Sequence, residues 1–452
     1  MVMLLFATFT GIAAISTISF FLLSCSSNLE ESMENVVTGE AITTAFTATI
    51  TGSFNNMDNN DLMYGKIAVL YCQVSDIAGD IFESWAGGND KPDCMIQRRG
   101  TKKSGGGYEA KIDNLKPDTQ YNFCLAFEAK DGTRSIGKTS VFSTKPFNVT
   151  LNTQPALEVW FFSATLSCNV ENMYEADADA CTFGFLISTE SGLSDNNATT
   201  FECELIDNAI TLNVNNLDVN TTYHLKPYIH IAAEDRFIYG QEKSFKTKEA
   251  DEMAVNLGLS VEWASVLLGA TSPGNEGDLF HWGETEPAKT DKEYTYFNPS
   301  DGTFRDIGND ISGTVYDAAT FKLQGKWRIP TVDEVQELID NCELSVKKGA
   351  TASENKLIIK SKKNGNTLIL PSTSIMERNS KGKYIISNDG SVSFMTSTEG
   401  FTQGYKNKGF YILCSNFYLP YYASSDEKLS LYLAVKNERS SAFCILPVHS
   451  KN

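Results

Sequence analysis

Two carboxylates in the C-terminal half of the chain have a spacing that could serve acid/base chemistry. Asp278 and Glu284 flank the apolar centre of the string Gly277-Asp278-Leu279-Phe280-His281-Trp282-Gly283-Glu284-Thr285. Two carboxyl groups on either side of a glycosidic bond are the groups that glycoside hydrolysis uses. The string is also typical of an organised loop, because its glycines free the backbone and its acidic side chains can tie it by hydrogen bonds. We favour the loop and predict no catalytic residue.

A second group of candidate residues is aromatic. Four aromatic residues surround Pro420 within positions 417–422. Tyrosine rings offer apolar faces with a polar tip, which suits wet interfaces and sugar stacking, and proline cannot join a central sheet ladder. We therefore predict a turn or loop at 416–426 that contributes the ligand surface; the alternative is that these rings pack on a core beside a strand. The predicted ligand-binding residues are Tyr418, Tyr421, Tyr422 and Asp426.

Metal ligands are scarce in this sequence. The chain has four histidines and contains no Cys-x-x-Cys or His-Glu-x-x-His string, so we predict no metal site and no cofactor. His224 and His230 fall on one face of a predicted strand, too far apart to share an ion within it, and we interpret them as surface residues. The acidic runs 57–61 and 175–179 could offer oxygen ligands to calcium, but they lack the Gly and the distal Glu of a calcium loop. Solvated turns are the interpretation that we favour for both runs.

The N-terminus carries a candidate modification site. Residues 1–23 contain no charged residue and are rich in Leu, Ile and Phe, and the string Leu22-Leu23-Ser24-Cys25 precedes a polar stretch. This arrangement resembles the lipobox of bacterial lipoproteins, which implies a signal peptide at 1–24, lipidation of Cys25 and a tether at 25–37. It also implies a lipid-anchored protein of the outer membrane that is exposed on the cell surface. The alternative is an uncleaved anchor helix, because 23 uncharged residues can span a bilayer.

Composition excludes several classes of protein. The 38 basic and 56 acidic residues give a net charge of −18, which argues against nucleic acid or an anionic membrane surface as the main partner. With 42% hydrophobic and 21% charged residues, the chain is neither disordered nor fibrous. At about 100 to 200 residues per domain, a chain of 452 residues predicts about three domains.

The first half of the chain contains an internal repeat. Residues 46–54 and 162–170 share the alternation of a half-buried strand, and 112–121 matches 214–223. Each copy has about a hundred residues of short strands with turn signals between them, which is typical of a β-sandwich. The two offsets, 116 and 102 positions, differ by 14, so the first copy has 14 extra residues. We place them in a long loop within 76–94, which is rich in Gly, Asp and Ser.

One string in each copy points to a particular kind of sandwich. Leu115, Pro117, Thr119 and Tyr121 resemble the fibronectin type III domain just before its sixth strand, and the second copy keeps Leu217, Thr221 and Tyr223. The resemblance implies fibronectin type III-like domains at 38–147 and 148–249, with both tyrosines in equivalent buried corners and their hydroxyls bonded to local backbone. Because side chains of a strand point alternately to its two faces, the sequence predicts which of them face inward and which outward. The inward set of the first copy is Tyr121, Phe123, Leu125 and Phe127, its outward set is Asn122, Cys124 and Ala126, and the inward set of the second copy is Tyr223, Leu225, Pro227, Ile229 and Ile231.

Residues 253–452 have a different character, with more Trp and Gly and longer loops. Thr331 and Glu334 have the spacing of a capping box, which predicts the start of a helix. We expect that helix to end near 341–342 and Trp327 to be buried where the chain enters it. Its apolar stripe is Val335, Leu338 and Ile339.

The strings 277–285 and 326–338 resemble the family named for the Fibrobacter succinogenes major paralogous domain. That family is similar to the superfamily of formylglycine-generating enzymes and C-type lectins. The resemblance implies an α+β C-type lectin-like domain, which is typically appended to exported lipoproteins and has no established catalysis. Because Leu446-Pro447-Val448 lacks the Arg that usually closes the family pattern, we carry over no ligand residue.

Three functions stay open at this point. Our first choice is a membrane-tethered binding or adhesion lipoprotein of the cell surface, non-catalytic, with a glycan or protein ligand. The alternatives are a structural subunit of a surface assembly and a carbohydrate-active enzyme with an unrecognised site. The expected partners are the membrane, through the lipid anchor, and that ligand, but no nucleic acid.

Overall fold

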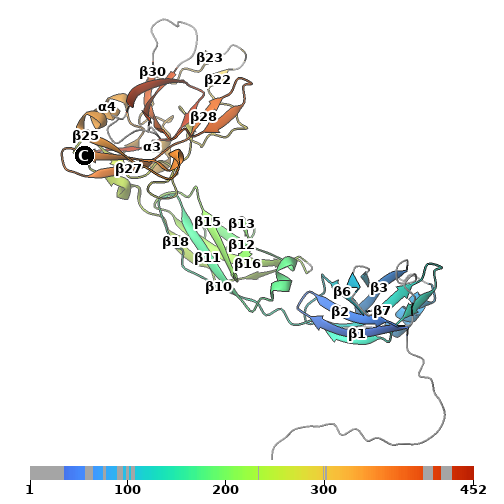
Figure 1. Cartoon of the computed structure of the whole chain (residues 1–452). Coiled ribbons are helices and arrows are strands. Elements are labelled where there is room, and N and C mark those ends of the chain that lie inside the picture. Colours follow the sequence, from blue (N-terminus) through green and yellow to red (C-terminus); the bar gives the residue numbers. More distant parts are fainter. Residues whose placement is uncertain are drawn as a thin grey trace, which may run out of the picture. The chain divides into compact units, whose positions relative to one another are not determined.

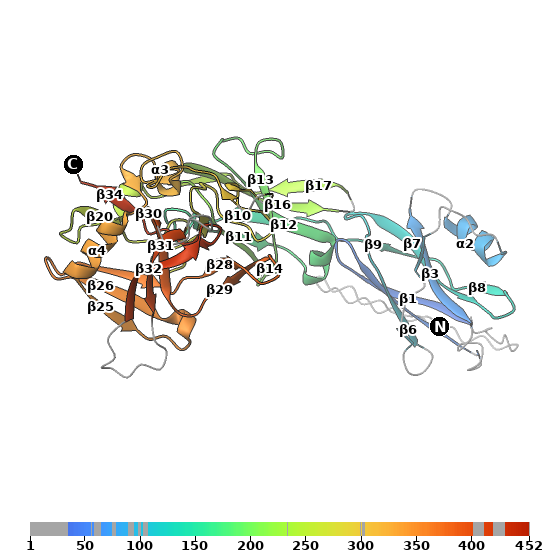
Figure 2. The same ribbon diagram turned by 90° about the horizontal axis from the view of Figure 1, so that it is seen from above.

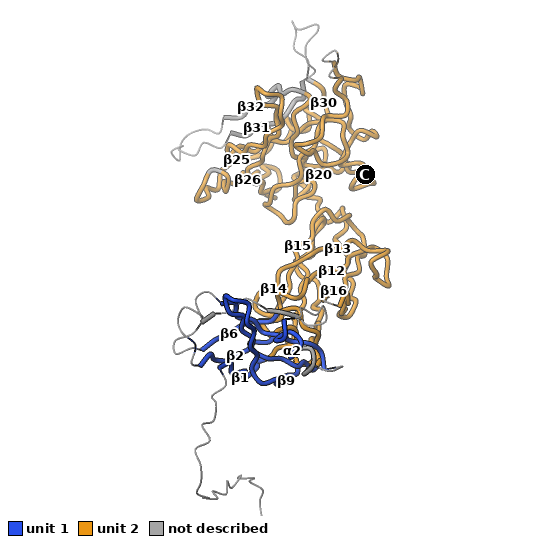
Figure 3. Tube along the Cα trace, turned by 90° about the vertical axis from the view of Figure 1, so that its right-hand side faces the viewer, with its two compact units in different colours: residues 1–42, 48–112, 120–143 blue, residues 43–47, 113–119, 144–452 orange. Residues whose placement is uncertain are grey.

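The computed structural model describes residues 35–451 except 56, 58–64, 75–77, 89–94, 98–100, 103–106, 233, 299, 301–302, 401–410 and 419–429 (Figure 1). The chain divides into two compact units (Figure 3). Unit 1 comprises residues 1–42, 48–112 and 120–143, and unit 2 comprises residues 43–47, 113–119 and 144–452. Within the described ranges, no helix is both long and apolar enough to cross a membrane. The apolar run 1–23 and Cys25 lie outside the described residues.

Two antiparallel sheets form the first sandwich. One sheet has the strand order β1 (Val36–Thr43), β2 (Ala48–Phe54), β6 (Gly107–Ile112) and β5 (Thr101–Lys102). The other has the order β4 (Met95–Gln97), β3 (Lys66–Gln73), β7 (Gln120–Glu128) and β8 (Arg134–Ile136), with β9 (Ser140–Ser143) also paired to β7. The four residues predicted to face inward on β7 are all buried.

The outer face of this second sheet is covered by a helix that the sequence analysis missed. We predicted a long loop within 76–94, and this was wrong, because α2 (Ala78–Ala86) forms there. Figure 2 shows α2 beside β3 and β7. Phe82 and Trp85 of α2 pack against Cys124 and Ala126, which are therefore buried although we predicted that they face outward. Both faces of β3 and β7 are consequently removed from water.

The second sandwich, in unit 2, repeats the strand order of the first. One sheet runs β10 (Thr150–Thr153), β11 (Ala164–Glu171), β15 (Ala209–Val214) and β14 (Leu205–Ile206). The other runs β13 (Thr199–Cys203), β12 (Cys181–Ser188), β16 (Thr222–Ile231) and β17 (Arg236–Tyr239), with β18 (Lys243–Lys246) paired to β16. All five residues predicted to face inward on β16 are buried, which confirms the alternation.

The two tyrosines at the starts of β7 and β16 are in equivalent positions. Tyr121 stacks on Phe142 with ring centroids 5.3 Å apart, and Tyr223 stacks on Phe245 at 5.8 Å, both at 21° between ring planes. Both tyrosines are buried, and the Tyr223 hydroxyl accepts a 2.9 Å hydrogen bond from the main-chain N–H of Asp218. The predicted corner geometry is therefore present at Tyr223.

One acidic run is not a solvated turn. Residues 175–179 fall in the 3₁₀ helix η2 (Glu175–Ala180), and Asp177 is fully buried there. Its carboxylate accepts hydrogen bonds from the main-chain N–H groups of Ala45, at 2.9 Å, and Phe46, at 3.0 Å, and from the hydroxyl of Thr44. Our prediction of a solvated turn is wrong for Asp177, because these donors replace water. Most of the other acidic run, 57–61, lies outside the described residues.

The C-terminal part of unit 2 is built of short sheets around one core. Two four-stranded sheets have the orders β19 (Ala254–Val255), β20 (Val261–Ala264), β34 (Val448–Ser450), β24 (Trp327–Arg328) and β21 (Phe280–His281), β33 (Ala442–Phe443), β28 (Ile375–Arg378), β29 (Tyr384–Ser387). Two three-stranded sheets have the orders β25 (Cys342–Lys347), β26 (Lys356–Ser361), β27 (Thr367–Pro371) and β30 (Val392–Gly400), β31 (Tyr411–Tyr418), β32 (Ser430–Glu438). Strands β22 (Phe297–Asn298) and β23 (Thr303–Phe304) form a hairpin. Helical segments are η3 (Ala250–Met253), α3 (Ala318–Leu323), α4 (Val332–Asn341) and η4 (Ala352–Glu354). Trp263, Trp282 and Trp327 are buried in the core that these elements share.

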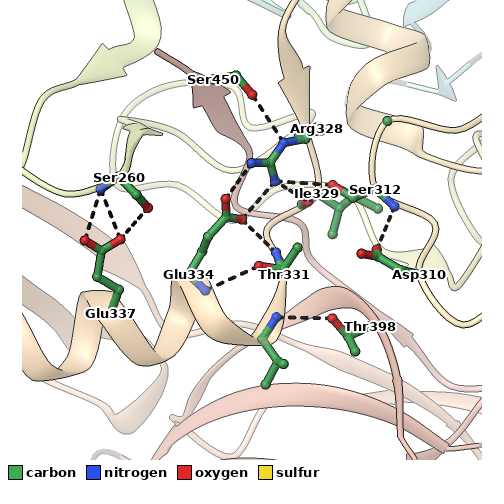
Figure 4. Close-up of polar contacts among 12 residues, drawn as sticks. Ser260, Asp310, Ser312, Arg328, Ile329, Thr331, Glu334, Glu337, Thr398 and Ser450 are labelled. Atoms are coloured by element: carbon green, nitrogen blue, oxygen red, sulfur yellow. Dashed lines mark hydrogen bonds and ion pairs between the residues drawn. The ribbon is translucent and has the colours of Figure 1, made fainter.

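Helix α4 has the predicted bounds and cap. The side chain of Thr331 accepts from the main-chain N–H of Glu334, and Glu334 accepts in return from that of Thr331 (Figure 4). Arg328 donates two hydrogen bonds to the Glu334 carboxylate, one of them at 2.8 Å, and a third, at 3.2 Å, to the Ser312 hydroxyl. The cap is therefore fixed by the strand that precedes the helix as well as by the helix itself.

Candidate functional site

The loop that carries Asp278 and Glu284 is tied by hydrogen bonds. The Glu284 carboxylate accepts from the main-chain N–H of Thr295 at 2.6 Å. Asp278 packs against Gly269, whose φ of +81° suits glycine and where a Cβ would overlap the carboxylate. Burial raises the pKa of Asp278, and the charge of Lys322 acts in the opposite direction. These contacts agree with the interpretation of residues 277–285 as an organised loop.

Behind this loop lies a buried cluster of aromatic and charged side chains. His281 is 2% exposed, and its ring contacts those of Tyr294 and Tyr384, with centroids 5.3 Å apart in each pair. Burial lowers the pKa of His281, with the charge of Glu284 opposing the shift. Arg439 lies 4.5 Å above the ring of Trp282 and forms an ion pair with Glu399 at 3.4 Å. Because the whole cluster is buried, it positions the loop and is closed to a large ligand.

The predicted aromatic ligand surface is mostly outside the described residues. Tyr418 is the last residue of β31, so the predicted turn or loop at 416–426 is wrong for residues 416–418, which belong to a strand. Tyr421, Tyr422 and Asp426 lie outside the described ranges. The proposed contribution of this segment to a ligand site stays a prediction.

The two histidines on the outer face of β16 have separate acidic partners. Nδ1 of His224 lies 3.3 Å from Glu242, and Nε2 of His230 lies 3.1 Å from Asp235. Neighbouring rings on this face stand in a row, since His230 stacks on Phe237 at 4.4 Å and Phe237 on Tyr239 at 5.8 Å. Phe237 and Tyr239 each remain 37% exposed, so this row presents partly exposed rings on the surface of the sheet.

The described thiols are mostly buried. Among the cysteines that the structure describes, seven form no disulfide bond, and burial raises the pKa of Cys168 and of Cys181 to about 12. A thiol with so high a pKa is inert as a nucleophile. Among the side chains that the structure describes, no group of three or more His, Cys, Asp and Glu is placed to hold a metal ion.

An open pocket lies beside α3, and sequence reasoning did not find it. It has a volume of about 870 Å³ and is lined by residues 218–221, 249–251 and 321–324 together with Glu286. We call it the α3 pocket. A signal for it existed in the sequence, because Ala319 and Leu323 of α3 face the core and place Phe321 on the opposite side of the helix.

Local hydrogen bonds fix each wall of the α3 pocket. The turn at 218–221 is held by a 2.6 Å bond from the Thr247 hydroxyl to the carbonyl of Asp218. The wall at 249–251 begins η3 through a capping box between Glu249 and Glu252. Helix α3 is capped by Asp317, whose carboxylate accepts from the main-chain N–H groups of Thr320, Gly313 and Ile329 at 3.0, 2.9 and 2.9 Å.

The lining of the α3 pocket combines carboxylates with one exposed ring. Three of the four lining carboxylates have partners within the protein: Glu286 lies 3.4 Å from Lys322, Glu249 lies 3.6 Å from Lys246, and Asp251 accepts from the Trp327 indole at 3.2 Å. Phe321 is 60% exposed. The pocket thus offers hydrogen-bond acceptors and an apolar ring to a ligand.

Solved structures that are similar to parts of this chain include two remote likenesses. No family model matches the chain, and no curated protein matches it. The sensor domain of the anti-sigma factor RsgI4 from Pseudobacteroides cellulosolvens is similar over 22% of this chain and 75% of its own, at 20% identity and a TM-score of 0.18. The FN1–FN3 domains of chicken CNTN1 are similar over 48% of this chain and 68% of their own, at 12% identity and a TM-score of 0.22. What the chain does is therefore inferred from its own residues.

Proposed function

We propose that this protein is a lipid-anchored binding or adhesion protein of the bacterial cell surface that captures a glycan or protein ligand without transforming it. The observation that carries the proposal is the α3 pocket, which is open, polar and equipped with an exposed ring. Pockets of this size accommodate small molecules or parts of larger ones. Three of the four carboxylates of the pocket are engaged in ion pairs or hydrogen bonds, which suits recognition better than proton transfer.

The proposal includes a cellular location and a domain organisation. Lipidation of Cys25 would tether the chain to the outer membrane, with 25–37 as the tether. We assign 38–147 and 148–249 as fibronectin type III-like domains, supported by the shared strand order of the two sandwiches and the paired tyrosines. We assign 253–452 as a C-type lectin-like domain, supported by the capped helix α4 and the tied loop around Glu284.

A binding screen separates this function from the two alternatives. Residues 26–452, immobilised through the N-terminus, are exposed to a glycan array and to extracellular protein fractions, and bound molecules are identified by mass spectrometry. We expect saturable binding of one ligand class, with the ligand recovered intact. Cleaved ligand would instead indicate a carbohydrate-active enzyme. Filaments in electron micrographs, without ligand binding, would indicate a structural subunit.

A further inference from the structure

We propose that the α3 pocket is the ligand site and that its ligand is an uncharged glycan, a proposal that rests on the capture function above. Phe321 is the first element of the argument. It is 60% exposed, whereas Ala318, Ala319 and Leu323 of the same short helix are buried. A single exposed ring is ordinary on a protein surface, but this one stands in the wall of a polar pocket. A ring in that setting offers the apolar faces of a sugar a surface to stack on.

The polar groups around the ring suit hydroxyl donors. An ionised carboxylate has about four lone-pair sites, and the ion pairs of Glu249 and Glu286 use only part of them. The side chains of Glu249, Asp251 and Glu286 remain 61%, 80% and 65% exposed, so their free oxygens can accept from sugar hydroxyls. Hydrogen bonds to a charged acceptor are stronger than those between neutral groups. Asn220 and Gln324 add amide groups that both donate and accept.

The charges of the pocket decide between classes of ligand. The lining contains one basic residue, Lys322, and four acidic residues: Asp218, Glu249, Asp251 and Glu286. This excess repels a phosphate or an acidic sugar. A cationic ligand is not required either, because three of the four carboxylates already have partners on the protein. An uncharged, hydroxyl-rich ligand satisfies the pocket without displacing any of these pairs.

The test measures affinity by isothermal titration calorimetry on residues 26–452. The probes are the neutral hexasaccharides of glucose, mannose, xylose and galactose units, with sialyllactose as the acidic probe and hexalysine as the cationic probe. We expect a neutral probe to bind with an affinity that changes less than about twofold between 50 and 500 mM salt, since no net charge is paired. Strong loss of affinity with salt, or binding confined to sialyllactose or hexalysine, would overturn the ligand class.

Variants locate the site. Phe321→Ala is expected to weaken binding of the neutral probe about tenfold or more, as for a central contact residue, and Glu286→Gln to weaken it about threefold. The matched control is Val315→Ala, because Val315 is 82% exposed in the same part of the chain but does not line the pocket. Melting temperatures of all variants are measured alongside, to separate binding from folding.

The outcomes distinguish this inference from the proposed function. If a neutral probe binds as well to Phe321→Ala and Glu286→Gln as to the unmodified chain, capture stands but the α3 pocket is not the site. Loss of binding in a Tyr421→Ala, Tyr422→Ala double variant, with the pocket variants unaffected, would move the site to 416–426. If no glycan or protein from the screen binds, the capture function itself falls, and this inference with it.

Discussion

Asp177 holds a turn of main chain inside the protein. Its carboxylate accepts from two main-chain N–H groups, those of Ala45 and Phe46. Phe46 is itself buried in the same core as Leu225 and Ile229 of β16. Because these N–H donors have no access to water, they depend on the Asp177 carboxylate as their hydrogen-bond acceptor.

We expect Asp177→Ala to lower the free energy of unfolding of unit 2 by about 2 to 4 kcal/mol, because it leaves buried N–H donors without an acceptor. Urea unfolding of residues 26–452 measures this, followed by tryptophan fluorescence; four of the five tryptophans belong to unit 2. The matched control is Asp179→Ala, an exposed position on the same η2 helix. Equal unfolding midpoints for the two variants would contradict the structural role of Asp177.

Residue-scale prediction from the sequence succeeded where the pattern is local. The alternation along β16 predicts which side chains are buried, because a strand repeats every two residues. Nothing in the run 175–179 distinguishes Asp177 from its neighbours, since the partners that bury it lie more than 130 positions earlier in the chain. The α3 pocket was missed for a similar reason, because its lining comes from three separate segments and from Glu286.

At the scale of elements, the start of α4 couples a helix cap to an ion pair. Burial opposes ionisation of Glu334, but hydrogen bonds from Arg328 and Thr331 outweigh it and hold the pKa of Glu334 below its ordinary value. The same pairing raises the pKa of Arg328. A carboxyl group whose pKa is lowered by folding stabilises the folded state above its unfolded pKa, and this stabilisation is lost as the pH falls through the folded value.

We therefore expect Glu334→Gln to destabilise the protein by about 2 kcal/mol at pH 7, as for a lost hydrogen bond to a charged group. The difference from the unmodified chain should shrink as the pH falls below about 4.5, where the unfolded carboxyl group takes up its proton. Urea unfolding at intervals between pH 7 and pH 3 provides the curve. Asp333→Asn, exposed in the same first turn, serves as the control with an effect of about 0.5 kcal/mol. A pH-independent difference for Glu334→Gln would contradict the assignment.

Tyr223, at the start of β16, makes two separable contributions to its sandwich. Tyr223→Phe removes the hydroxyl that accepts from Asp218 and is expected to cost about 1 kcal/mol. Tyr223→Ala also removes the ring that stacks on Phe245, and is expected to cost about 3 to 5 kcal/mol. Thermal unfolding of residues 26–452 measures both, with Tyr174→Phe at an exposed position as the control. Unchanged stability in Tyr223→Ala would refute the corner.

Helix α2 marks the limit of element prediction from this sequence. The glycines and polar residues around it favour a loop, and α2 is only nine residues long. Phe82 and Trp85 have helical spacing, but two residues are a weak period. What stabilises the helix is the apolar outer face of β3 and β7, which only the assembled sheet presents. Helix α4 was predictable because its cap, stripe and end are all local.

At the scale of the whole molecule, the proposed anchor can be tested directly. We expect the mature protein to begin at Cys25 and to fractionate with the membrane. Cys25→Ala should leave an unprocessed precursor or release the protein, because the lipidated residue is gone. Cell fractionation, with mass spectrometry of the N-terminal peptide, measures both properties, and Cys72→Ala, a buried thiol, is the control. Unchanged processing and membrane retention in Cys25→Ala would favour the uncleaved helix.

The composition of unit 2 has a consequence for anyone who divides the chain into fragments. Ala45 and Phe46 precede the second sandwich by about a hundred positions, yet they belong to its core. An expression fragment that starts at 148 therefore lacks part of its own interior, and a fragment that stops at 147 carries Phe46 without the surroundings that bury it. Cutting at the boundary suggested by the repeat would make both pieces prone to aggregate, because each exposes apolar surface that the intact chain buries.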